Sequence, residues 1–142
     1  MEKSRFTVLV VDGEVSLRRL MLQALRRGGI DPIGAADGAA GLEAFLANRE
    51  RIDLVVLDMI MPGMSGLDLA AELERRRPGV KILYISGHGS SVAMASIQRQ
   101  SADQVLLKPF EQQALMERVM HLLRLDDLRS RRAGRNWKRE SA

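Results

Sequence analysis

The chain has 142 residues, enough for one domain with a buried core, and its 46% hydrophobic content argues against disorder of the whole chain. It contains no cysteine and only two, widely separated histidines, which excludes a disulfide framework and a cysteine-based zinc site. The net charge of +4 arises after residue 123, since residues 124–142 carry seven Lys or Arg and three Asp or Glu, so it does not identify the folded part as a nucleic-acid binder.

Short apolar runs alternate with stretches that repeat apolar residues at helical spacing. In chain order, we predict strands at residues 6–11, 31–36, 54–57, 80–85 and 105–107. Each strand is followed by a predicted helix, at about residues 17–27, 39–48, 65–77, 90–100 and 111–125. The second strand is the weakest, because it contains Pro32 and Gly34. Five strand–helix units in order predict an α/β fold with a parallel sheet between two layers of helices.

Polar side chains end four of the predicted strands. Asp12, Asp58, Ser86 and Lys108 each close an apolar run. Since the carboxyl ends of parallel strands meet at one edge, these side chains should gather where open α/β sheets bind ligands. Asp58 alone would be an ordinary turn residue, and Lys108 alone a surface lysine. The combination favours chemistry at the edge of the sheet over these separate explanations.

A carboxylate such as Asp58 can act as a nucleophile toward phosphorus. That reaction calls for a hard cation such as Mg²⁺, which accepts carboxylate oxygens, and for a fixed ammonium group, which Lys108 could supply. Ser86 could donate a hydrogen bond to a phosphoryl oxygen. A cis bond before Pro109 would aim Lys108 inward, although most bonds that precede proline are trans. We expect His88 to be an exposed loop residue and the methionines around Asp58 to serve packing.

The motifs at these positions resemble those of the receiver domain of two-component response regulators. They are Val10-Val11-Asp12, the run from Leu57 to Gly66, Ile85-Ser86-Gly87 and Leu107-Lys108-Pro109-Phe110. The resemblance covers roughly residues 5–125 and implies a flavodoxin-like (βα)5 three-layer sandwich with strand order 2-1-3-4-5. It implies that Asp58 accepts a phosphoryl group, which Lys108 and Ser86 contact. It further implies that Asp12, Asp58 and the backbone carbonyl of Ile60 hold Mg²⁺.

Two positions depart from the family pattern. The family usually has a second acidic residue directly after Asp12, where it ligates Mg²⁺, and this chain has Gly13. Asp12 could shift to coordinate the ion or Glu14 could swing in, although an acidic residue that opens a helix is the plainer interpretation of Glu14. The family also carries an aromatic reporter of phosphorylation three positions before the lysine, and here that residue is Val105.

These departures leave two functional hypotheses. The first is a working phosphoacceptor with a weakened Mg²⁺ site, and the survival of Asp58, Ser86 and Lys108 favours it. The second is a degenerate receiver that binds proteins independently of phosphate. A flavodoxin-like small-molecule binder has little support, because no phosphate-cradling glycine loop follows the first strand and aromatic residues make up only 4% of the chain.

The remaining expectations concern partners and the end of the chain. We expect a stand-alone receiver over residues 1–125 and a basic, flexible tail over residues 126–142. Deletion of residues 129–142 should leave folding intact. The implied partners are a sensor histidine kinase or phosphotransfer protein, a downstream protein and possibly a second copy of the chain. Nucleic acid is an unlikely partner and a membrane is not expected. The protein should be a cytoplasmic signalling domain rather than an enzyme, although it assists its own phosphorylation and dephosphorylation.

Overall fold

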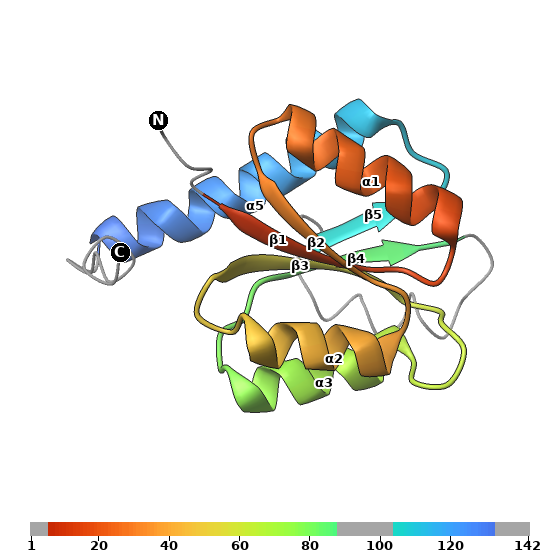
Figure 1. Cartoon of the computed structure of the whole chain (residues 1–142). Coiled ribbons are helices and arrows are strands. Elements are labelled where there is room, and N and C mark those ends of the chain that lie inside the picture. Colours follow the sequence, from red (N-terminus) through yellow and green to blue (C-terminus); the bar gives the residue numbers. More distant parts are fainter. Residues whose placement is uncertain (1–5, 88–103, 133–142) are drawn as a thin grey trace.

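The computed structural model describes residues 6–87 and 104–132, which form a three-layer α/β sandwich (Figure 1). Five parallel strands make one sheet in the order β2-β1-β3-β4-β5, which confirms the predicted flavodoxin-like arrangement. The strands are β1 Thr7–Val11, β2 Asp31–Ala35, β3 Ile52–Asp58, β4 Ile82–Ser86 and β5 Val105–Leu107. The described helices are α1 Val15–Arg27, α2 Gly38–Ala47, α3 Gly66–Arg76 and α5 Gln112–Arg132.

Helices cover both faces of the sheet, with α1 and α5 on one side and α2 and α3 on the other (Figure 1). Strands β1, β3 and β4 are therefore buried along their whole length. A strand that is covered on both faces needs apolar side chains in both directions, which explains the near-continuous apolar runs in the sequence. Edge strand β2 is partly exposed and accommodates Pro32 there.

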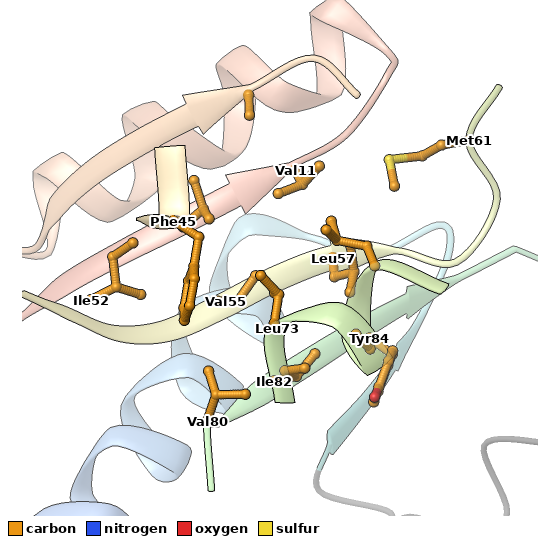
Figure 2. Close-up of a cluster of buried hydrophobic side chains, with 14 of the residues drawn as sticks. Val11, Phe45, Ile52, Val55, Leu57, Met61, Leu73, Val80, Ile82 and Tyr84 are labelled. Atoms are coloured by element: carbon orange, nitrogen blue, oxygen red, sulfur yellow. The ribbon is translucent and has the colours of Figure 1, made fainter. Parts of the chain in front are cut away.

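Two hydrophobic clusters hold the layers together. Figure 2 shows the cluster under α2 and α3, where Phe45 of α2 and Leu73 of α3 meet Ile52 and Val55 of β3. The second cluster lies under α1 and α5, and both helices contribute fully buried side chains, such as Leu25 and Val119. Burial of each such side chain contributes roughly 1.5–3 kcal/mol relative to its exposure to water. These clusters fix the orientation of the strands that carry the polar residues.

Most element bounds differ from the predicted ones by one or two residues, and three of the differences concern the start of β3, the start of β4 and the end of α5. Strand β3 begins at Ile52 rather than residue 54, because the carboxylate of Asp53 accepts the Thr7 N–H at 2.8 Å where the pairing of β1 and β3 shifts by one residue. Strand β4 begins at Ile82 rather than residue 80. Helix α5 continues to Arg132 rather than residue 125, in a stretch without glycine or proline. The predicted helix at residues 90–100 and His88 lie outside the described residues.

Candidate functional site

The carboxylate of Asp58 lies at the carboxyl end of β3, where only 7% of the residue is exposed. Its Oδ1 accepts the Ile60 N–H at 3.1 Å, and its Oδ2 pairs with the Lys108 ammonium at 3.1 Å. The Lys108–Pro109 bond is cis. Asp58 and Lys108 are 50 positions apart in the sequence, and the convergence of β3 and β5 at one edge of the sheet brings them together.

Ser86 belongs to the same edge through the pairing of the strands. Asp58 lies opposite Ile85 on β4, so Ser86 comes one position beyond it. The Lys108 N–H donates to the Ser86 carbonyl at 2.8 Å, which ties this strand end to the lysine. The Ser86 side chain is buried, and its hydroxyl lies 3.4 Å from the carbonyl of Gly87.

Asp12 is fully buried and held on three sides. Its N–H donates to the Ala35 carbonyl at 3.1 Å, its Oδ1 accepts the Glu14 N–H at 2.8 Å, and its carbonyl accepts from Arg18 Nη1 at 2.7 Å. The remaining oxygen, Oδ2, is buried and has no hydrogen-bond donor among the described residues. A buried carboxylate oxygen without a donor carries a desolvation cost, so the site favours a positively charged ligand.

The electrostatics of the site support that interpretation. Burial raises the pKa of the Asp12 carboxyl above its ordinary value, and the negative charges of Asp58 and Glu14 add to this rise. The hydrogen bond from the Glu14 N–H and the charge of Lys108 oppose it. A hard divalent cation would relieve the repulsion between Asp12 and Asp58, and carboxylate and carbonyl oxygens are the ligands that Mg²⁺ takes. The donor set of Asp12, Asp58 and the Ile60 backbone carbonyl therefore fits Mg²⁺.

The number of acidic ligands in that set is small. The described part of the chain brings no three His, Asp or Glu side chains together as a metal-binding group. At Gly13, an added Cβ would lie 3.6 Å from the Ala36 carbonyl oxygen and 3.7 Å from Pro62 Cδ, both ordinary contacts. The backbone there thus has room for a side chain, and the sequence simply supplies none.

The residues around the acidic centre are partly apolar. Met59 and Met61 are buried in the core cluster and Met64 packs against it, which confirms their predicted packing role. Val105 lies beside Tyr84 of β4 in the strand register, and Tyr84 is buried. Among the described residues, four large hydrophobic side chains are markedly exposed. Three of these adjoin the strand-end loops that carry the site: Val15, Ile60 and Leu107.

Sequence reasoning missed the contribution of Arg18. Its side chain passes beside Gly34 of β2, and its guanidinium donates to the Asp12 carbonyl. The signal that could have revealed it is the position of a long cationic side chain one turn into α1, within reach of the strand end that precedes the helix.

A family model described as the response regulator receiver domain matches residues 8–120. The chain belongs to this family. It is similar to the DNA-binding response regulator MtrA of Mycobacterium tuberculosis, with 36% identity over 128 residues. This match covers 89% of the chain and 54% of MtrA, so the chain spans about half the length of this relative.

Solved structures agree with the family. A response regulator receiver domain protein from Clostridium thermocellum superposes with a TM-score of 0.79 at 27% identity, covering 87% of this chain and 98% of that one. The CheX–CheY–BeF3–Mg complex from Borrelia burgdorferi matches with a TM-score of 0.74 at 26% identity, covering 82% of this chain and 88% of that one. No helix in the described parts of this receiver domain has the length and apolarity needed to cross a bilayer.

Proposed function

We propose that this receiver domain accepts a phosphoryl group on Asp58 from a histidine kinase or phosphotransfer protein, in a Mg²⁺-dependent reaction in the cytoplasm. The observation that carries the proposal is the arrangement around Asp58. Its carboxylate pairs with Lys108 at 3.1 Å, near a second, buried carboxylate, Asp12, whose Oδ2 has no donor among the described residues. An ammonium group and an unsatisfied acidic oxygen beside one nucleophilic carboxylate suit phosphoryl transfer better than a structural role.

The chemistry follows from these positions. A carboxylate oxygen of Asp58 forms the new P–O bond while the P–N bond to the donor's imidazole breaks. The imidazole keeps the electron pair and then takes a proton. Lys108 stabilises the negative charge on the phosphoryl oxygens, and Ser86 donates its hydroxyl to one of them. Mg²⁺ held by Asp12, Asp58 and the Ile60 carbonyl would neutralise further charge on the phosphoryl group.

The surroundings of the site suit a protein as the phosphoryl donor. Val15, Ile60 and Leu107 are 51%, 64% and 46% exposed, which is unusual for apolar side chains near a charged centre. A hollow lined by Leu17, Pro109 and Phe110 adjoins Lys108. An apolar rim around a polar centre is typical of surfaces that bury against a partner.

Several comparisons support the remaining parts of the proposal. The Borrelia burgdorferi complex includes Mg²⁺, which agrees with the oxygen-rich donor set found here. MtrA is described as DNA-binding, but the match covers only about half of it, so we propose that this receiver signals through protein contacts, self-association among them. We infer no direct contact with nucleic acid from residues 6–87 and 104–123, because the basic residues before position 124 are balanced by acidic ones.

The test is intact-protein mass after incubation with a small phosphodonor, with and without millimolar Mg²⁺, for the wild type and Asp58→Asn. We expect one added phosphoryl group that requires both Mg²⁺ and Asp58. Glu43→Gln, an exposed carboxylate on α2, is the control and should be labelled normally.

Gly13 favours one alternative, a degenerate receiver that binds partners independently of phosphate. That alternative predicts a folded protein that neither the small phosphodonor nor a cognate kinase labels at any Mg²⁺ concentration. Such a result would replace the phosphoacceptor proposal.

A further inference from the structure

Glu14 occupies the N-cap position of α1 but does not cap the helix with its side chain. Glutamate is a poor N-cap residue compared with Asp, Asn, Ser or Thr, so capping does not account for its presence. The described residues offer its carboxylate no hydrogen bond or ion pair. A favourable interaction with the helix dipole remains, but that interaction does not fix where the carboxylate lies.

The backbone of Glu14 is held close to Asp12. Its N–H donates to Asp12 Oδ1 at 2.8 Å, which fixes the start of its side chain two residues from the buried carboxylate. Glu14 and Lys108, the partner of Asp58, line the same hollow.

The site has a specific deficit that a third carboxylate would fill. Asp12 and Asp58 carry two negative charges, and Lys108 cancels one of them. Asp12 Oδ2 is buried and has no hydrogen-bond donor among the described residues. Gly13 contributes no side chain, although its backbone has room for one.

We propose that Glu14 takes over the role that Gly13 leaves open, and that its carboxylate helps to hold the divalent cation of the Asp12–Asp58 site, directly or through a bound water. This inference rests on the metal site within the proposed function. The three carboxylates do not yet form a metal-binding group in the structure, so Glu14 must change rotamer when the cation binds. The change is inexpensive, because Glu14 is exposed and has no bond to break.

The experiment measures cation affinity without any phosphoryl transfer, by Mn²⁺ electron paramagnetic resonance and by competition with Mg²⁺. The variants are Glu14→Gln, Gly13→Asp, the double variant and Glu111→Gln, which removes an equal charge from an exposed residue before α5. We expect Glu14→Gln to weaken binding about tenfold. Glu111→Gln should change it by less than about twofold, because solvent screens an exposed charge.

The double variant separates a ligand from a general electrostatic effect. With Asp at position 13, loss of Glu14 should cost less than about twofold, because the two acidic groups then serve the same cation. Equal losses in both backgrounds, or equal affinities of Glu14→Gln and Glu111→Gln, would overturn the inference. So would cation binding that appears only with Gly13→Asp.

Phosphorylation data keep the two proposals apart. Mg²⁺-dependent labelling of Asp58 together with unchanged cation affinity in Glu14→Gln would remove the role of Glu14 and leave the proposed function in place. If Glu14→Gln loses cation affinity but Asp58 of the wild type is not labelled, the role of Glu14 as a metal ligand stands and the proposal that Asp58 accepts a phosphoryl group fails.

Discussion

The guanidinium of Arg18 donates a hydrogen bond to the backbone carbonyl of Asp12 at 2.7 Å. This bond joins the second turn of α1 to the end of β1, and it helps to hold Asp12, whose buried Oδ2 has no donor among the described residues. Arg18 therefore positions Asp12, although Arg18 is not itself one of the proposed metal ligands.

Arg18→Gln should therefore weaken cation binding while leaving the protein folded. We expect an unfolding free energy lower by about 1–2 kcal/mol, since a charge-assisted hydrogen bond is lost, and Mg²⁺ affinity lower by roughly threefold or more. Chemical denaturation and Mn²⁺ titration measure the two effects. Arg19→Gln removes the same charge from an exposed neighbour and should change neither.

Asp12→Asn should raise the thermal stability of the metal-free protein at neutral pH. Burial raises the pKa of Asp12 above its ordinary value of 3.8, so the folded state binds this proton more tightly than the unfolded state. The corresponding stability is present below the unfolded pKa and is lost as the pH rises through the higher folded pKa. An Asn side chain does not ionise, so Asp12→Asn does not lose this stability. The melting temperatures of the two proteins should therefore diverge as the pH increases above about 4.

Addition of Mg²⁺ should reverse the order of the two proteins. The cation stabilises the wild type by binding the folded state, and it has less to bind in Asp12→Asn. A wild type that is more stable than Asp12→Asn at neutral pH without any divalent cation would contradict the electrostatic account of the site.

Lys108→Met should slow the labelling of Asp58 by a small phosphodonor. Lys108 is the cation paired with Asp58, and removal of one charged group that stabilises the transferred oxygens costs on the order of 100-fold in rate. Initial rates of mass increase measure the effect. Lys81 precedes β4 at the amino ends of the strands, away from the site at their carboxyl ends. Lys81→Met removes the same charge and should be labelled at the wild-type rate.

Gly66→Ala should be strongly destabilising, because a Cβ at this position would lie 2.3 Å from the Asp58 carbonyl oxygen and 2.7 Å from Met59 Cα. Both neighbours are backbone atoms that cannot rotate away, so we expect a loss of about 2–3 kcal/mol in unfolding free energy. Gly13→Ala meets only ordinary contacts and should stay within about 0.5 kcal/mol of the wild type. Similar urea denaturation curves for the two variants would contradict this explanation.

Removal of residues 129–142 should leave the fold intact. Among the α5 residues whose burial is described, which end at Arg124, the buried hydrophobic side chains are Leu115, Val119, Leu122 and Leu123. We expect less than about 1 kcal/mol of lost stability on truncation. Leu122→Ala should instead cost about 2–4 kcal/mol through the cavity it leaves. Calorimetry of both proteins makes the comparison, and a truncation as harmful as Leu122→Ala would show that the end of α5 carries part of the fold.

The sheet and much of its polar edge could be predicted from the sequence for one physical reason. A parallel strand buried on both faces reads as an unbroken apolar run, so Asp12, Asp58 and Ser86 stand out where such runs stop. Their convergence then follows from the common direction of the strands. The roles of these residues in phosphoryl transfer stay predictions.

Other features depend on contacts that no local pattern encodes. The bond from Arg18 to Asp12 depends on where a long, flexible side chain settles beside β2. The early start of β3 depends on a polar residue, Asp53, that is buried because it accepts a backbone N–H from another strand. The length of α5 beyond residue 125 reflects helix propensity in a stretch where the apolar pattern has already ended.

Because α5 is long, a small tilt of the helix displaces its end by a larger amount. The last buried side chain that the structure describes in α5 is Leu123, and the helix runs on to Arg132, past the start of β1 (Figure 1). At a rise of about 1.5 Å per residue, this extension is roughly 14 Å long. A tilt of about 10° in the packed part of the helix would therefore displace its end by roughly 2 Å. Lys108 lies in the connection between β5 and α5. A small rearrangement there that tilts α5 would thus produce a larger displacement at the far end of the helix.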